Sequence, residues 1–449
     1  MKSHLPPAPG AAHIPTSRTP AALRLSCLCL AVGAALSGCA STASGPRGLT
    51  FSSERPAVIA TEVPSGMLYT AERGFGLEPG AHETGKPFLF SARADEGNHT
   101  VTITFGDKSA ASSTTVRNEL RRLALENVRT APGQFVTRSF TVNVRTPQIK
   151  AVKGIEAGTV KRKEPRETID EAWAWDDRLT LEFTGTNPAV RSIHIAPVKV
   201  PTLFLLGDST VSDQGREPFA SWGQMLPRFF KPGLAVANYA QSGETYRDSI
   251  GRRRLDKVLS SMERGDMVLM QFGHNDQKQQ KDGKGGPFTT YQAEIRTHVE
   301  AIRQRGGIPV VISPMERRRF DEQGKAYQTL ADYTEAARQV AAELKVAFID
   351  LNALSLPFYQ ALGPDKSKYA FAQISPTQTD NTHHNNYGSY QLARAVVSGI
   401  VKNNLPMAKF IVDDVAPFDP HRPDPFETFA LPASPGFTTV RPLGDESNR

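Results

Sequence analysis

The sequence predicts an α/β fold with a parallel sheet in its C-terminal half, preceded by an all-β sandwich. Two successive patterns indicate this. Short segments with a period of two extend to about residue 200, and continuous apolar runs that alternate with helical segments follow. A length of 449 residues leaves room for two or three domains. The proportions of apolar (39%) and charged (22%) residues are ordinary, which excludes a disordered chain and a coiled coil.

Residues 51–200 are expected to form the sandwich. The segments that indicate strands are rich in β-branched residues or alternate between apolar and polar positions: Thr100–Phe105, Val136–Val144, Leu179–Phe183 and Val190–Ile195. Alternation places one face of each strand on a core and the other in water, as in an antiparallel sandwich. The spacing of Val116–Leu125 predicts one inserted helix.

Residues 201–410 are expected to form the parallel sheet and its helices. The five apolar runs are Leu203–Leu206, Leu234–Ala237, Met267–Phe272, Ile308–Ile312 and Val346–Ile349. Helical spacing is clearest in Tyr291–Gln304, Leu330–Leu344 and Tyr387–Val401. Continuous apolar strands that alternate with helices are typical of a parallel sheet covered on both faces. The proline-rich residues 411–449 predict an extended C-terminal tail.

The first 38 residues are expected to be an export signal. The apolar stretch Leu25–Leu36 follows Arg24 and is too short to span a bilayer. It ends in the sequence LSGC at Cys39, which resembles the bacterial lipobox, in which the cysteine is acylated and becomes the new N-terminus. We therefore expect a lipoprotein anchored at the bacterial cell envelope, in the outer membrane, facing the periplasm or the surface. The alternative is a secretory signal cut near Ala40, which gives a secreted protein.

Cysteine usage and charge exclude several classes of protein. All three cysteines lie in the first forty residues, so the body holds neither a disulfide framework nor a cysteine zinc site. Without residues 1–38, 50 cations and 46 acidic residues remain, a net charge of +4 instead of +7. Because no long basic run or basic amphipathic helix follows, nucleic acid is not expected as a partner. Residues 39–50 are expected to be a linker.

Four polar motifs follow the apolar runs of the predicted parallel sheet or precede its last helix. They are Gly207-Asp208-Ser209-Thr210, the loop from Asn238 to Arg247, Gly273-His274-Asn275-Asp276, and Asp380-Asn381-Thr382-His383. In open α/β sheets, ligands bind beyond the carboxyl ends of the strands, so these motifs are expected to meet at one site.

Ser209, His383 and Asp380 are the candidate catalytic residues. A serine nucleophile needs a base to take its proton, and the base needs a group that orients it. Asp380 and His383, on a loop that enters a helix, can lie side by side with the second ring nitrogen facing Ser209. The tetrahedral intermediate needs donors, for which we expect the main-chain N–H groups of Ser209 and Gly243 and the side-chain amide of Asn275.

These motifs, in this order and spacing, resemble the four blocks of the SGNH (GDSL) hydrolases over about residues 201–405. The longer forms, Asn238-x-Ala-x-x-Gly-x-Thr-x-Arg247 and Phe272-Gly-His-Asn-Asp276, are similar to rhamnogalacturonan acetylesterase and related carbohydrate esterases. The resemblance implies a flavodoxin-like three-layer fold and a serine esterase that needs no metal or organic cofactor. It implies O-acetylated pectin or another plant polysaccharide or oligosaccharide as the substrate. The upstream sheets resemble the galactose-binding jelly roll of bacterial two-domain members.

Further polar residues are assigned around this site. The candidate substrate contacts are His274, Asp276, Arg247 and Arg317; for His274 and Asp276 the alternative is that they support the catalytic groups from behind without touching substrate. Arg317 belongs to one of two arginine runs, and its guanidinium could bind a galacturonate carboxylate; the alternative is a solvated loop. Asp208 is expected to hold the nucleophile loop. His384 follows His383 directly, and the spacing Asp-x-x-His favours His383 as the base.

Two other functions remain open. A lipid esterase or thioesterase on the same fold would need an apolar acyl tunnel, for which the polar strand-end loops give no support. A carbohydrate-binding surface lipoprotein with a silent catalytic domain is opposed by the complete set of candidate catalytic residues.

Overall fold

The computed structural model describes residues 47–50, 61–62, 67–79, 85–281 and 283–435, which all belong to the same structural unit. The predicted export signal, the lipobox cysteine Cys39 and residues 436–449 of the predicted tail lie outside the described residues. None of the helices in the described ranges has the length and hydrophobicity that a membrane span requires.

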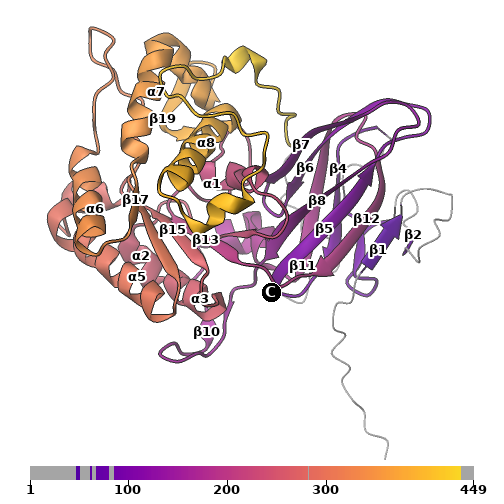
Figure 1. Ribbon diagram of the computed structural model, residues 1–449, viewed down its shortest axis with the longest axis horizontal. Coiled ribbons are helices and arrows are strands. Elements are labelled where there is room, and N and C mark those ends of the chain that lie inside the picture. Colours follow the sequence, from indigo (N-terminus) through magenta and orange to yellow (C-terminus); the bar gives the residue numbers. More distant parts are fainter. Residues whose placement is uncertain (1–46, 51–60, 63–66, 80–84, 282, 436–449) are drawn as a thin grey trace, which may run out of the picture. The chain divides into compact units, whose positions relative to one another are not determined.

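Two five-stranded sheets form the N-terminal part (Figure 1), with strand orders β2-β1-β12-β5-β8 and β3-β4-β11-β6-β7. The strands of the first sheet are β1 (Arg47–Thr50), β2 (Thr61–Glu62), β5 (Gly97–Phe105), β8 (Val136–Val144) and β12 (Val190–Pro197). Those of the second are β3 (Phe75–Leu77), β4 (Phe88–Arg93), β6 (Ser112–Asn118), β7 (Arg122–Thr130) and β11 (Arg178–Thr186). All neighbouring pairs are antiparallel except β1 and β2. The predicted linker therefore ends in a strand, because Arg47–Thr50 pairs with β12.

Side chains from both sheets share one apolar core. On β5, Val101, Ile103 and Phe105 are fully buried, whereas the residues between them are partly exposed. They belong to the same cluster as Phe90 of β4 and Leu181 of β11. The strands predicted from the period of two are confirmed, whereas the resemblance to a galactose-binding jelly roll stays a prediction.

The predicted helix Val116–Leu125 is wrong, because this segment forms the hairpin between β6 and β7. Glu119 and Arg121 adopt φ values of 50° and 60°, in the left-handed region that interrupts any right-handed helix. Val116 and Leu123 are both buried but lie on different strands. Their spacing of seven residues matches a helix only because the turn between the strands leaves both side chains buried. A two-stranded ribbon of β9 (Gln148–Ile149) and β10 (Gly158–Thr159) follows β8.

The C-terminal part is built on a five-stranded sheet with the order β14-β13-β15-β16-β17. The strands are β13 (Thr202–Gly207), β14 (Ala235–Asn238), β15 (Met267–Gln271), β16 (Ile308–Ile312) and β17 (Ala347–Ile349), and all four pairs are parallel. Numbered along the chain, the strands lie in the order 2-1-3-4-5, which is the flavodoxin-like order. The second strand is added on one side of the first strand, and the third to fifth strands are added on its other side. The predicted parallel sheet is thus confirmed, with each strand close to its predicted bounds.

Helices cover both faces of this sheet (Figure 1). The helices are α1 (Trp222–Met225), α2 (Tyr246–Gly251), α3 (Arg254–Ser261), α4 (Asp276–Lys281), α5 (Gln292–Gln304), α6 (Ala331–Glu343), α7 (Leu351–Lys366) and α8 (Asn386–Lys402). Leu205 shares one core with α1, α7 and α8, whereas its neighbour Leu206 shares the other with α3, α5 and α6. This alternation along β13 gives the three layers. Helices α5, α6 and α8 lie almost at their predicted bounds.

The two parts of the chain also share apolar contacts. Leu123 of β7 belongs to the core around α8, and Trp175 belongs to the core around α3 and α5. The described part of the predicted tail packs back on both parts: Phe429 joins the α8 core, and Ser434 Oγ donates to Glu182 on β11 at 2.7 Å. In the described part of this segment, residues 411–435, the regular structure is one short 3-10 helix, Phe426–Thr428. The predicted domain boundary at residue 200 stays a prediction.

Candidate active site

Ser209 lies in the tight loop that follows β13, at the carboxyl edge of the parallel sheet. Asp208 holds this loop, because its Oδ1 accepts hydrogen bonds from the main-chain N–H (2.9 Å) and hydroxyl (2.8 Å) of Thr210. Burial alone would raise the pKa of Asp208, but the nearby His274 ring and the Thr210 hydrogen bonds keep it below its usual value. Ser209 itself is 7% exposed and faces the pocket described below.

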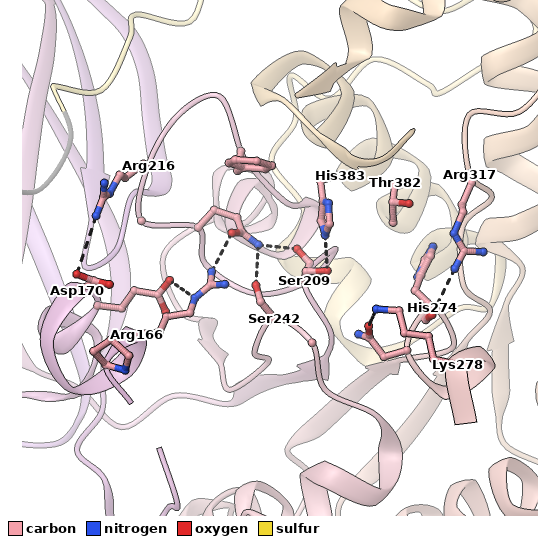
Figure 2. A pocket seen from close by; sticks show the side chains of 17 residues that line it. Arg166, Asp170, Ser209, Arg216, Ser242, His274, Lys278, Arg317, Thr382 and His383 are labelled. Carbon is pink, nitrogen blue, oxygen red and sulfur yellow. Dashed lines mark hydrogen bonds and ion pairs between the residues drawn. The ribbon is translucent and has the colours of Figure 1, made fainter. Parts of the chain in front are cut away.

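His383 lies between Ser209 and Asp380. Its Nε2 is 2.8 Å from Ser209 Oγ (Figure 2). Its Nδ1 is 2.8 Å from Asp380 Oδ2. A carboxylate oxygen can only accept, so Nδ1 carries the proton and Nε2 is free to accept from the serine hydroxyl. Burial alone would raise the pKa of Asp380, but hydrogen bonds from the His383 side chain and main chain hold it well below its usual range. Asp380 therefore stays ionised and can stabilise a protonated His383.

The predicted loop carrying Asp380 and His383 is a strand in the structure. It is β19 (Gln378–His384), which pairs with β18 (Phe371–Ser375) in a two-stranded antiparallel ribbon. The register shifts twice along this ribbon, and Asp380 Oδ1 accepts the main-chain N–H groups of Thr382 (2.7 Å) and His383 (3.0 Å). This local turn places the Asp380 side chain beside the His383 ring despite the strand.

The adjacent His384 points the other way. It is buried, its Nε2 lies 2.8 Å from the hydroxyl of Tyr359, and its ring packs on Phe371. Burial, together with the neighbouring imidazole of His383, lowers the pKa of His384 to about 3. Because it is kept neutral inside the core, it cannot replace His383 beside Ser209.

The expected oxyanion donors lie beside Ser209. Gly243 and Asn275 both line the pocket, at the ends of β14 and β15 respectively. Gly243 has a φ of 74°, a conformation that favours glycine. Asn275 Nδ2 donates to the main-chain oxygen of Glu244 at 3.1 Å, and its Oδ1 accepts from Lys278 Nζ at 2.8 Å. The three predicted donors thus come from the ends of three adjacent strands.

The predicted substrate contacts separate into two groups. His274 and Arg317 line the pocket, and His274 Nε2 has no hydrogen-bond partner within the described part of the chain. Asp276 and Arg247 do not line it. Asp276 is buried, accepts the main-chain N–H of Tyr246 at 3.1 Å and has its pKa raised well above the usual value by burial. Arg247 forms an ion pair with Glu294 at 2.9 Å instead. Asp276 therefore binds the start of α2, and Arg247, a residue of α2, binds Glu294; neither side chain reaches the cavity.

A cavity of about 720 Å³ opens above Ser209. Most of the residues in its described lining have polar side chains, and Pro165 and Phe219 are the two whose side chains consist of hydrocarbon alone. Arg317 is held at the rim by neutral groups: the side chains of Gln277 (2.9 Å) and Thr329 (3.3 Å) and the main-chain oxygen of His274 (3.3 Å). Burial lowers the pKa of Arg317, but a guanidinium stays charged.

One wall of the cavity comes from a segment that the sequence did not indicate. Pro165, Arg166, Asp170 and Glu171 line the pocket from the irregular helix Arg166–Asp170 and its flanks, which lie between β10 and β11. Figure 2 shows Arg166 and Asp170 on one side of Ser209 and Lys278 and Arg317 on the other.

Buried ion pairs attach this wall to the hydrolytic side. Arg254 lies 2.6 Å from both Glu167 and Glu244, and all three side chains are almost fully buried. Glu171 also accepts a hydrogen bond from Gln241 at 3.1 Å. The arginine run 252–254 was visible in the sequence, but nothing in it indicated the distant partners.

The arrangement can activate a hydroxyl, stabilise an oxyanion and admit a polar substrate. In this arrangement Ser209 can act as a nucleophile with His383 as its base, and Gly243 and Asn275 line the same cavity with N–H groups that can serve as donors. Within the described residues no group of three His, Cys, Asp or Glu side chains is placed to hold a metal ion.

The C-terminal part of the chain is similar in sequence to known proteins. Residues 205–388 match the GDSL-like Lipase/Acylhydrolase family. Rhamnogalacturonan acetylesterase RhgT of Bacillus subtilis (strain 168) is 36% identical over 226 residues, which cover 48% of this chain and 95% of that protein. Probable rhamnogalacturonan acetylesterase YesY of the same strain is 32% identical, with 47% of this chain and 98% of that protein covered. An acetylxylan esterase from Geobacillus stearothermophilus of known structure aligns at 22% identity with a TM-score of 0.34, covering 44% of this chain and 94% of its own.

Proposed function

This chain belongs to the GDSL-like lipase/acylhydrolase family and is a carboxylic ester hydrolase, and we propose that it removes O-acetyl groups from an acetylated polysaccharide. The observation that carries the proposal is the hydrogen-bonded series Ser209–His383–Asp380, which opens into a polar cavity large enough for sugar residues. The two rhamnogalacturonan acetylesterases support acetyl as the acyl group and a polysaccharide as its carrier.

The proposed reaction proceeds through an acetyl-enzyme. His383 Nε2 takes the proton of Ser209 Oγ as the oxygen attacks the acetyl carbonyl, and the negative charge that develops is stabilised by the N–H groups of Ser209, Gly243 and Asn275. The sugar oxygen then leaves with the proton from His383. A water molecule, deprotonated by the same imidazole, attacks the acetyl carbonyl. The bond to Ser209 Oγ then breaks, Ser209 takes the proton back from His383, and acetate is released. Asp380 remains ionised and orients the ring throughout.

Rhamnogalacturonan or another pectin is the proposed substrate among polysaccharides. Arg317 and Lys278 line the same side of the cavity, and no carboxylate of the described residues lies within ion-pair distance of either. On the other side, Arg166 is paired with Glu171 at 2.6 Å. A galacturonate carboxylate would therefore find its cationic partner on the Arg317 side.

A lipid esterase or thioesterase is the alternative within the same family. Its substrate would need an apolar channel for the acyl chain, whereas Pro165 and Phe219 alone give the described lining hydrocarbon side chains. A series of 4-nitrophenyl esters separates the two activities: acetate should be the best substrate, and a preference for eight or more carbons would favour a lipid substrate. Labelling of Ser209 by a fluorophosphonate probe would exclude a silent binding protein.

We also propose that the protein is exported and anchored by an acylated Cys39, or else secreted after cleavage nearby. The support is the apolar stretch Leu25–Leu36 followed by the lipobox-like sequence. Cells grown with a labelled fatty acid should incorporate the label into the wild type. A Cys39→Ala variant that still takes up label would contradict the anchor.

The experiment that tests the proposed function is acetate release from a panel of acetylated pectins, xylans and mannans. The wild type should release acetate fastest from pectin, and Ser209→Ala should release none. A wild type that leaves every acetylated polysaccharide intact would contradict the proposal.

A further inference from the structure

We propose that two lysines, Lys163 and Lys278, position the oxyanion hole by binding the carbonyl oxygens of two of the three amide groups whose N–H groups are its donors. The first amide is the peptide between Ser242 and Gly243, and the second is the side chain of Asn275. The inference rests on the proposed esterase function. It assigns a role in that reaction to Lys163, which precedes the family match at residues 205–388.

Gly243 lies in a β-turn, and the central peptide of a β-turn can take one of two opposite orientations. The N–H of Glu244 donates to the oxygen of Gln241 at 3.3 Å, and Gly243, at the third position, has a φ of 74°. A positive φ there indicates a type II turn, which differs from type I by a reversal of the central peptide. That peptide joins Ser242 to Gly243, so a reversal would turn the Gly243 N–H away from its present direction.

Lys163 holds this peptide in one orientation. Its Nζ donates a hydrogen bond to the oxygen of Ser242. Because a trans peptide directs its C=O and N–H to opposite sides, fixing the oxygen of Ser242 fixes the direction of the Gly243 N–H. Ser242 and Gly243 line the cavity, whereas Lys163 lies outside its described lining. The ammonium therefore contacts this peptide without being one of the groups that line the cavity.

The charge of Lys163 adds to this effect. Burial lowers the pKa of Lys163, since the ammonium is partly withdrawn from water. Its field on the peptide is correspondingly less screened. A hydrogen bond from a charged donor is about twice as strong as one from a neutral donor, and it polarises the amide so that the N–H becomes a stronger donor.

Lys278 makes the same contact with the second amide. Its Nζ donates to Asn275 Oδ1 at 2.8 Å, while Asn275 Nδ2 donates one of its two protons to the oxygen of Glu244 at 3.1 Å. These contacts fix the plane of the amide and which end carries the nitrogen. The second Nδ2 proton remains for the oxyanion. Each amide donor thus has an ammonium on its own carbonyl oxygen.

The test uses Lys163→Met and Lys278→Met with a small neutral substrate, 4-nitrophenyl acetate, which has no carboxylate for a lysine to bind. Each variant should lower kcat about 10-fold, a fraction of the 10²- to 10³-fold loss of a whole donor, with KM unchanged. Matched controls are Lys161→Met and Lys281→Met, whose side chains are exposed and do not line the cavity, and which should keep wild-type kcat. Lys163→Gln, a neutral donor, covers the case in which Lys163→Met does not fold.

A double-mutant cycle distinguishes positioning from a general loss of structure. In an Asn275→Ala background, Lys278→Met should cause no further loss of kcat, whereas Lys163→Met should still cause its own. Unchanged kcat in the lysine variants, a change in KM alone, or losses for Lys278→Met that add fully to Asn275→Ala would overturn the proposal. Turnover by the wild type and its absence in Ser209→Ala test the proposed function separately.

Discussion

The two sides of the active-site cavity have different origins. Ser209, Gly243 and Asn275 follow strands of the parallel sheet, inside the region that matches the hydrolase family. The facing wall, Pro165–Glu171, comes from the chain between two strands of the N-terminal part and lies wholly before that region (Figure 2). The first side carries the groups to which the proposed reaction assigns the cleavage of the ester bond, and the second forms the facing wall of the same cavity.

The two sides are also attached in different ways. The loop that carries Ser209 is held by local hydrogen bonds, such as those that Thr210 donates to Asp208 two residues away. The wall is held by buried ion pairs between distant residues, with Glu167 and Arg254 separated by 87 positions. The N-terminal part is therefore built into the active site and is expected to affect catalysis.

The largest effect on this attachment is expected for Arg254→Met. The change leaves Glu167 and Glu244 buried without their cation, and removal of one partner of a buried ion pair costs about 3 to 5 kcal/mol. Urea denaturation followed by circular dichroism measures the free energy of unfolding. Arg252→Met, at a partly exposed neighbour, is the control and should change it by less than about 1 kcal/mol. Equal effects of the two variants would show that the wall is held by other contacts.

Substitutions on the hydrolytic side should lower the rate of hydrolysis and leave the free energy of unfolding almost unchanged. Asn275→Ala removes one oxyanion donor, so kcat on 4-nitrophenyl acetate should fall about 10²- to 10³-fold while the free energy of unfolding changes little. Gln280→Ala, at an exposed position of α4, the helix that follows Asn275, should keep the wild-type rate. A fall of less than threefold for Asn275→Ala would exclude this amide from the oxyanion hole.

Acid should weaken the parallel-sheet part through a buried histidine. Burial lowers the pKa of His298 to about 4, against about 6.5 in the unfolded chain. The unfolded state therefore binds the proton first as the pH falls, so stability is full above pH 6.5 and declines toward pH 4, by about 3 kcal/mol. In His298→Gln, the difference in unfolding free energy between pH 7 and pH 4 should be smaller by this amount. An identical difference in the two proteins would contradict a neutral His298.

The smallest effect is expected at the rim. Arg317→Ala should raise KM for acetylated pectin about 10-fold, the loss expected for one charge-assisted contact, and leave acetylated xylan almost unaffected. Arg319→Ala, at an exposed position outside the described lining, is the matched control. Equal losses of Arg317→Ala on both polysaccharides would remove the pectin-specific role.

The positions of the strand-end motifs were predictable because each position is set by the apolar run directly before it in the sequence. An apolar run fixes where a strand ends, and the residues after it reach the carboxyl edge of the sheet whatever the rest of the chain does. Ser209, Gly243 and Asn275 were placed in this way. The direction of a side chain is less predictable: Asp276 belongs to the same motif as Asn275, yet it turns inward to accept the N–H of Tyr246.

The facing wall was not predictable, because its position depends on contacts between distant segments. Nothing local distinguishes Glu167 from an exposed acidic residue until Arg254 is known to lie beside it. The predicted helix Val116–Leu125 failed for a related reason, since two strands and a turn reproduced helical spacing. The ribbon that carries His383 was also missed, although the spacing from Asp380 identified the correct histidine to face Ser209.

The most direct test of the account is to trap the acyl-enzyme. The wild type is mixed with an acetylated oligosaccharide or 4-nitrophenyl acetate, quenched in acid within the first turnover and digested for mass spectrometry. An added acetyl group should appear on the peptide that contains Ser209, and it should be absent from Ser209→Ala. Acetylation of another residue, or full turnover by Ser209→Ala, would contradict the assignment of Ser209 as the nucleophile.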